Sequence, residues 1–256
     1  MMRIAAVCLL LLLSAPLAAD GVTIRYAGSS TIGKFIADAA PIYGEAVIEI
    51  ATRSESAGGE RCVMARTCDI GGVARKVDPE VLRRGIVATL IGHDAIAVVV
   101  NASNPVRAID RETLAGIFSG EIENWSEIGG SDVAIEPYVV APSSATHGVF
   151  RQSVLAGREY AGVEIVEPDA RMVATVARKP GAIGQISFSF LKYADQIRAL
   201  SVDGEEASVE NAGYPIARPL YLLTPGEPRG AVRDFIDWAL GPVGQAILRG
   251  RFVGAD

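Results

Sequence analysis

The stretch VTIRYAGSSTIGKFIADAAPIYG, residues 22–44, contains one complete unit of strand, loop and helix. Its first residues alternate between apolar and polar side chains, which predicts a β-strand. Its second half places Ile32, Phe35 and Ile36 at the spacing of an amphipathic helix. The loop between them, AGSST (27–31), consists of small residues. A strand that leads directly into a helix is the repeating unit of α/β proteins.

The same alternation continues along the chain. Strand-like apolar runs occur at 46–53, 68–74, 95–101, 136–140, 164–166, 182–189 and 217–224. Helical patterns occur in a stretch that ends at Met64, at 111–118, 125–128, 146–155 and 169–178 (with Asp169 as its cap), and at 230–250 with a break at Gly241-Pro242. This order predicts parallel sheets with helices on both faces. In such sheets, ligands bind at the carboxyl ends of strands, where helices begin.

The N-terminal segment MMRIAAVCLLLLLSAPLAA, residues 1–19, has the layout of a secretory signal peptide. Arg3 precedes an apolar run, and small residues follow it, which predicts cleavage after Ala19. A permanent membrane anchor is the alternative, but the apolar run is shorter than the roughly 20 residues that span a bilayer. We therefore expect an exported protein whose mature part contains 237 residues.

The composition limits the classes of partner. Loss of Arg3 with the signal peptide changes the formal charge from −6 to −7. An acidic protein is a poor candidate for binding nucleic acid or anionic lipid. A small anion is compatible with this charge, because a local site can oppose the global field. The mature length is sufficient for one large domain or two smaller lobes with their own cores.

Two cysteines, Cys62 and Cys68, remain in the mature chain. In an oxidising compartment a disulfide between them is the first expectation, and it would join the start and end of a short helix formed by the five intervening residues. Free buried thiols are the second alternative. A metal site is the third, but the histidines, His93 and His147, are distant in sequence. We expect neither a metal nor a cofactor.

Three loops that open helices share one character: AGSST (27–31), SESAGG (54–59) and APSSATHG (141–148). Each offers hydroxyl groups and the unpaired backbone N–H groups of a helix start, which together favour an anion. Taken singly, each loop is also an ordinary set of helix caps. Three such loops could surround a tetrahedral oxyanion.

The sequence gives little support for catalysis. Ser144 and His147 are three residues apart, but no nucleophile elbow surrounds them. The glycine-containing turns at 129–132 and 241–244 lack the Gly-Lys-Ser/Thr of a nucleotide-binding loop. We therefore do not expect an enzyme.

Several segments match the motifs of one known family in their order. The most specific is LAGIFSGEIENWSEIGG (114–130); the others are YAGSSTI (26–32), SAGG…CDIGGVAR (56–75), GHDAIAVVVNASNPV (92–106), PGAIGQISFSF (180–190) and YPIARPLYLLT (214–224). With these motifs the chain resembles the periplasmic phosphate-binding proteins of ABC-type uptake systems, within the type II periplasmic binding proteins. The resemblance covers essentially the whole mature chain.

The resemblance implies two α/β lobes, each a mainly parallel sheet flanked by helices, that close around a ligand. Two hinge strands would join them, with crossings near residues 98–101 and 214–220. Lobe 1 would then comprise residues 20–98 and 215–256, and lobe 2 residues 99–214. The resemblance also implies a monomer that delivers its solute to an inner-membrane ABC permease.

The family's ligand-binding residues are matched unevenly. The hydroxyl positions correspond to Thr31 with its neighbour Ser30, to Ser56, and to Ser144, Ala145 and Thr146, where Ala145 replaces a glycine. Many relatives carry an Arg shortly before the third loop, where this chain has Val140. Some relatives carry an Asp that accepts a phosphate proton, where this chain has Ala74.

A buried oxyanion needs compensating charge or many hydrogen bonds. Arg75 and His147 are therefore candidate replacements for the missing Arg. Arg53 and Lys34 are weaker candidates, and a solvated surface position is the simpler interpretation of all four. Asp69, at a strand start, is expected to be a structural hydrogen-bond acceptor.

The sequence thus predicts a solute-binding protein that captures phosphate or a related small oxyanion. The alternative is a relative whose pocket has been reassigned or lost, with a role in signalling or surface attachment. The motivation for this alternative is the uncharged pair of positions at Val140 and Ala74.

Overall fold

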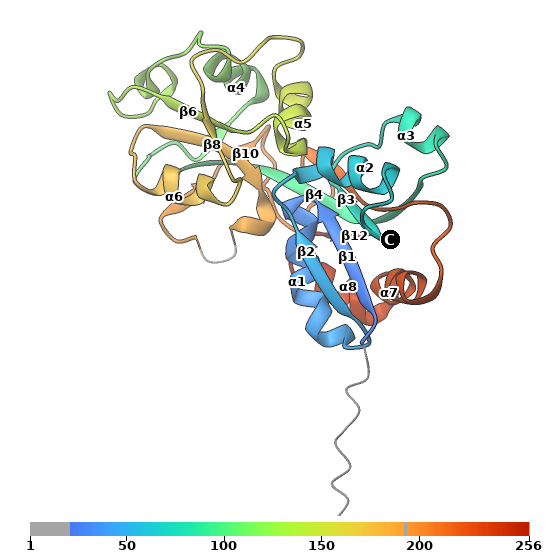
Figure 1. Ribbon diagram of the computed structural model, residues 1–256. Coiled ribbons are helices and arrows are strands. Elements are labelled where there is room, and N and C mark those ends of the chain that lie inside the picture. The colour runs from blue at the N-terminus through green and yellow to red at the C-terminus, as the bar shows by residue number, and fades with distance from the viewer. Residues whose placement is uncertain (1–20, 192–193, 256) are drawn as a thin grey trace, which may run out of the picture.

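The computed structural model describes residues 21–191 and 194–255 and consists of two α/β lobes joined by a continuous sheet (Figure 1). The strand order is β2-β1-β3-β11-β4-β8-β6-β7. The outer strands of each lobe pair in parallel, whereas the central strands β3, β11, β4 and β8 pair antiparallel. The predicted α/β class and two-lobed arrangement are confirmed. The predicted signal peptide lies outside the described residues.

Lobe 1 is built from the two ends of the described chain. Its first part contains β1 (Thr23–Gly28), α1 (Ser30–Tyr43), β2 (Val47–Ala51), α2 (Glu55–Met64), β3 (Ile70–Val73) and α3 (Pro79–Arg83). Its second part contains β11 (Ala217–Thr224), α7 (Gly230–Leu240), α8 (Pro242–Leu248) and β12 (Val253–Gly254). Gly241 ends α7, and Pro242 opens α8, as the sequence predicts.

Lobe 2 is formed by the middle of the chain. It contains β5 (Ala108–Ile109), α4 (Arg111–Phe118), η1 (Trp125–Ile128), β6 (Glu136–Val140), α5 (Ala145–Val154), β7 (Glu164–Val166), α6 (Arg171–Ala177), β8 (Ala182–Ser187), η2 (Phe188–Phe190), β9 (Ile197–Ala199) and β10 (Ser201–Val202). Its apolar core gathers around Trp125, Phe118 and Phe150. A separate core in lobe 1 includes Phe35 and Phe235.

One long strand, β4 (Val87–Asn101), belongs to both lobes. Up to Ala95 it pairs with β11, and from Ile96 onward it pairs with β8 and β9. The strand therefore changes its pairing partners at Ala95–Ile96, and the expected crossing near 98–101 remains a prediction. The chain returns through Ile216, whose carbonyl accepts from the Ile96 N–H at 2.8 Å, and continues into β11. The expected lobe boundaries remain a prediction.

The expected disulfide is present, but the expected helix around it is not. Cys62 and Cys68 are bonded, with their Cα atoms 5.4 Å apart. Cys62 lies in the last turn of α2, which ends at Met64, and Arg66 has a φ of 55° that no α-helix accommodates. The bridge therefore ties the end of α2 to the segment before β3. Asp69 accepts three hydrogen bonds from Arg25, which confirms its expected structural role.

The expected cap of α6 is also different. α6 begins at Arg171 with Ala170 as its cap residue and without a side-chain cap. The carboxylate of Asp169 instead accepts a hydrogen bond from the hydroxyl of Ser144, in the loop before α5, at 2.7 Å. Among the described residues, no helix combines the length and apolar character that a membrane span requires.

We predict that replacing both Cys62 and Cys68 by serine lowers the free energy of unfolding of residues 20–256 by about 2 kcal/mol, because a short covalent loop restricts the unfolded chain. Denaturant unfolding with and without reductant measures this difference. The double variant, which contains no cysteine, serves as the control and should not respond to reductant. Native protein that reacts with a thiol reagent before reduction would contradict the disulfide.

Candidate functional site

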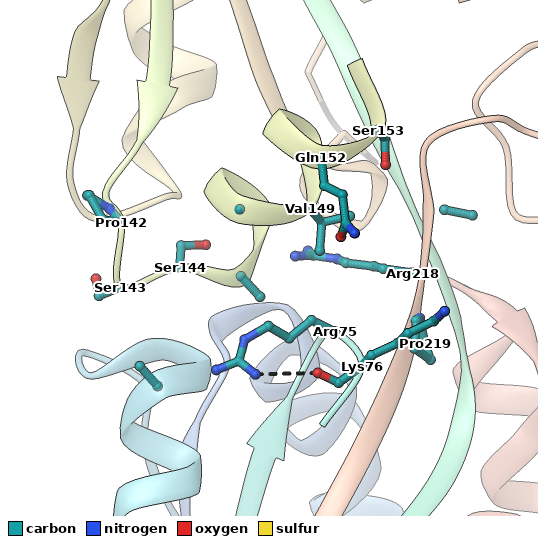
Figure 2. Close-up of a pocket in the computed structure, with 14 residues that line it drawn as sticks. Arg75, Lys76, Pro142, Ser143, Ser144, Val149, Gln152, Ser153, Arg218 and Pro219 are labelled. Carbon is teal, nitrogen blue, oxygen red and sulfur yellow. Dashed lines mark hydrogen bonds between the residues drawn. The ribbon is translucent and has the colours of Figure 1, made fainter. Parts of the chain in front are cut away.

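The N-termini of α1, α2 and α5 approach one another at the boundary between the lobes. Ser29 caps α1, and Ser144 caps α5 by accepting from the Thr146 N–H at 3.3 Å. The first N–H groups of a helix lack intrahelical partners and carry partial positive charge. A cavity of about 540 Å³ opens beside them, lined by both lobes (Figure 2). This arrangement suits a small anion.

The predicted hydroxyl residues are buried near this boundary, and of them Ser144 lines the cavity. Thr31, Ser56, Ser144 and Thr146 are each at most 3% exposed. The Ser56 hydroxyl oxygen accepts from the Ala74 N–H at 3.1 Å, so its own proton remains available for a ligand. The Ser30 and Thr146 hydroxyls are buried and have no hydrogen-bond partner within the described parts of the chain. Buried hydroxyls of this kind need a partner, and a bound oxyanion would supply one.

The cation of the site is Arg218, which the sequence analysis missed. Arg218 lies on β11, is 2% exposed and extends between α5 and Arg75 (Figure 2). Its Nε and Nη2 donate to one oxygen of Asp94 at 3.0 and 2.8 Å, and Nη2 also donates to the Thr31 hydroxyl at 3.0 Å. Its Nη1 has no hydrogen bond to any described residue, and Arg218 lines the cavity. This nitrogen is available for an oxyanion.

One signal in the sequence could have identified this residue. In the strand ARPLYLLT, alternation places Arg218 on the same face as Leu220 and Leu222, which are both 0% exposed. An arginine on the buried face of a strand requires a buried partner. Asp94, in the long apolar run of β4, is that partner.

The two proposed replacement cations are differently placed. Arg75 lines the cavity, but its guanidinium forms a two-pronged ion pair with Glu60, with both N···O distances 2.6 Å. His147 donates from Nδ1 to the Val140 carbonyl at 2.8 Å, and its ring packs edge-to-face on Tyr160. Both side chains therefore have protein partners, and their contact with a ligand stays a prediction.

The remaining positions have simple structural explanations. Ala145 is the first residue of α5, where alanine fits as well as glycine. Val140 is fully buried in the core of lobe 2. Lys34 lies over the ring of Phe190, with 4.7 Å between its Nζ and the ring centroid, and Arg53 is exposed at the rim of a second cavity.

Two buried carboxyl groups, Glu55 and Asp169, also reach the site, and sequence reasoning missed their role. Glu55 opens α2 with a φ of 49° and accepts from the Ser30 N–H at 2.9 Å. Burial and the negative charge of Asp169 raise the pKa of Glu55 to about 7, against the hydrogen bond from the Ser30 N–H and the positive charge of Arg218. Burial likewise raises the pKa of Asp169, against the hydrogen bond from Ser144 and the charge of Arg218.

Comparison with known proteins identifies the class. The model of the PBP superfamily domain matches residues 14–243, so the chain belongs to that family. Within it, the chain is homologous to phosphate-binding proteins of the PstS type, as the sequence motifs predict.

The named relatives differ in how much they share with this chain. PstS of Bacillus subtilis is 34% identical over 164 residues, which cover 61% of this chain and 54% of that protein. SphX of Synechococcus elongatus is 28% identical over 217 residues, which cover 75% of this chain and 64% of SphX. The chain thus spans between half and two thirds of the length of these curated relatives.

A solved structure from Clostridium perfringens, assigned to phosphate ABC transport and containing bound phosphate, superimposes with a TM-score of 0.83 at 27% identity. The superposition covers 91% of this chain and all of the other. A phosphate transport receptor from Vibrio cholerae, at 21% identity and a TM-score of 0.71, shares the fold.

The raised pKa of Glu55 predicts that the anion-free protein is most stable when this carboxyl is protonated. The free energy of unfolding is highest below the ordinary pKa of a glutamate. It falls as pH rises from there to about 7, where Glu55 ionises in the folded protein. Glutamine does not ionise, so between pH 5 and 8 we expect the free energy of unfolding of Glu55→Gln to fall by about 2 kcal/mol less than that of the native protein. Urea unfolding of both proteins at pH 5 and at pH 8 measures this difference in the free energy of unfolding. Equal pH dependence in native protein and variant would contradict the prediction.

Proposed function

We propose that this chain is an exported solute-binding protein that captures phosphate, or a closely related oxyanion, between its two lobes and delivers it to the permease of an ABC transporter. The observation that carries this proposal is the buried Arg218, which donates to the Thr31 hydroxyl in the first turn of α1 and lines the same cavity as Ser144 and Ala145 at the start of α5. A cation, hydroxyl donors and helix N-termini are the groups that bind tetrahedral oxyanions in proteins.

Family membership supports the transport role. The relatives carry the names of phosphate-binding proteins, and the superimposed structure from Clostridium perfringens contains phosphate. Binding without catalysis, a periplasmic location and a monomeric state belong to the same proposal. The sequence motivation for a lost pocket was the uncharged pair of positions at Val140 and Ala74. Arg218 answers the first of these, because it can supply from β11 the positive charge that Val140 lacks.

Calorimetric titration of phosphate into residues 20–256, freed of anions by unfolding and refolding, tests the proposal. We expect a dissociation constant below about 1 µM, equivalent to roughly 8 kcal/mol of binding free energy. Absence of binding to phosphate and to arsenate would contradict the proposal and favour a reassigned or lost pocket.

We predict that Ser56→Ala and Thr146→Val each weaken phosphate binding at least about tenfold, because each removes a buried hydroxyl donor to a charged ligand. Titration of each variant measures the loss. Ser153→Ala is the matched control, since Ser153 lines the same cavity from the last turn of α5, away from the helix start. A loss in the control with none in the two variants would place the anion elsewhere.

Arg218→Lys is expected to weaken phosphate binding by about 10- to 100-fold, because lysine can still pair with Asp94 but cannot also direct a second nitrogen at the ligand. Arg233→Lys, at an exposed position on α7, is the control for the exchange itself. Thermal unfolding checks that both variants fold. An unchanged affinity in a folded Arg218→Lys protein would exclude Arg218 from the site.

A further inference from the structure

Two carboxyl groups from opposite lobes meet beside the proposed phosphate site. Glu55 opens α2 of lobe 1, and Asp169 precedes α6 of lobe 2. They are 7% and 2% exposed, and both line a cavity of about 310 Å³ at the lobe boundary. Ser143 lines this cavity and the larger one, so the two cavities are neighbours. The carboxyl groups therefore flank the space in which the anion would lie.

Each carboxylate is joined to a helix start that belongs to the site. Glu55 Oε2 accepts from the N–H of Ser30, the first residue of α1, at 2.9 Å. Asp169 Oδ2 accepts from the hydroxyl of Ser144, the cap of α5, at 2.7 Å. The two acids thus compete with an anionic ligand for donors of the same helices, unless they carry protons.

Cations do not neutralise this pair. Neither Glu55 nor Asp169 forms a salt bridge within the part of the chain that the structure describes, and Arg218, which attracts both, is already paired with Asp94. The other titratable or charged groups around the pair and the two cavities are Tyr26, Arg53, Arg75 with Glu60, Lys76 and Glu167. Arg53, Lys76 and Glu167 are exposed to water, which weakens their effect.

A dianion beside two ionised buried carboxylates is strongly unfavourable, because like charges at short range repel and burial removes their hydration. Protonation of a carboxylate in the pair removes its repulsion of the anion. It also gives that carboxyl group an O–H that can donate a hydrogen bond to the anion. The pKa of Glu55, raised to about 7, makes such a proton available near neutral pH. A bound anion would raise the pKa further, since its charge adds to that of Asp169.

We propose that Glu55 and Asp169 form a proton-holding pair that closes on the bound oxyanion, so that phosphate is captured together with a proton. This inference rests on the proposed function and adds a selectivity to it. Phosphate brings a hydroxyl that can donate to whichever carboxylate remains ionised. Sulfate has no proton at neutral pH and meets only repulsion from an ionised pair. The pair therefore takes over the selection that Ala74 cannot provide, because alanine has no acceptor.

The proposal fixes the direction of the pH dependence. Above about pH 7.5, phosphate is a dianion and the free pair is increasingly ionised, so each binding event must take up a proton. The dissociation constant of phosphate then rises by roughly tenfold for each pH unit. Sulfate does not titrate in this range, so any pH dependence of its binding reports the protons of the protein alone.

Calorimetry of residues 20–256 at pH 8.0, in two buffers with different heats of ionisation, measures the proton uptake. We expect about one proton for each phosphate bound, as the linkage requires. Glu55→Gln and Asp169→Asn should each reduce the uptake, flatten the pH dependence of phosphate binding and strengthen sulfate binding at least tenfold. Glu164→Gln removes one exposed negative charge from β7 and is the matched control, expected to match the native protein.

The outcomes separate this inference from the proposed function. Phosphate binding without proton uptake at pH 8.0, or sulfate binding as tight as that of phosphate, would overturn the proton-holding pair and leave phosphate capture intact. Failure of the native protein to bind any oxyanion at pH 6.0 and 8.0 would instead contradict the proposed function. Since the uptake is measured on the native protein, the test holds even where a variant fails to fold.

Discussion

The buried ion pair between Arg218 and Asp94 connects β4, the strand that both lobes share, to the proposed binding site. Asp94 lies on β4 and also accepts a hydrogen bond from Ser187 of β8 at 2.8 Å, so the pair is anchored in both lobes. A buried pair of this kind adds little net stability, yet loss of one partner leaves an uncompensated charge. Its importance lies in its position, because β4, which belongs to both lobes, and the neighbouring β11 together hold a guanidinium that lines the cavity.

The proposed anion site combines this fixed cation with groups that belong to separate lobes. Thr31 and Ser56 come from lobe 1, whereas Ser144 and Thr146 come from lobe 2. If phosphate binds as proposed, it contacts donors from both lobes, so its binding favours the arrangement in which the lobes meet. The carboxyl groups of Glu55 and Asp169 face each other across the same boundary, and their repulsion opposes closure whenever both are ionised. The proposed anion binding and proton uptake would therefore both depend on the contact between the lobes.

Much of the fold was predictable from the sequence, because it is encoded locally. The strand at 217–224, the helix at 111–118 and the break at Gly241-Pro242 match the structure closely, since alternation, helical spacing and proline act within a few residues. The hydroxyl loops were found for the same reason. Asp169 was misread as a cap, because a carboxylate before a helix has two possible partners and only the tertiary fold brings Ser144 within reach.

Arg218 and Glu55 show why the charges of the site were harder to predict. Each is separated from its partners by a long stretch of chain: Arg218 from Asp94 by 124 positions, and Glu55 from Asp169 by more than a hundred. No local pattern relates such residues. A buried-face arginine in an apolar strand was the single available signal. Even this signal shows only that a partner exists, and does not identify it.

A crystal structure of residues 20–256 grown with arsenate tests the location of the anion most directly, because the anomalous scattering of arsenic marks its position. We expect the arsenic between the lobes, with arsenate oxygens within hydrogen-bond distance of Arg218 Nη1 and of the Thr31, Ser56 and Thr146 hydroxyls. Arsenate bound elsewhere, or Arg218 in contact with Asp94 and Thr31 alone, would contradict the site described here.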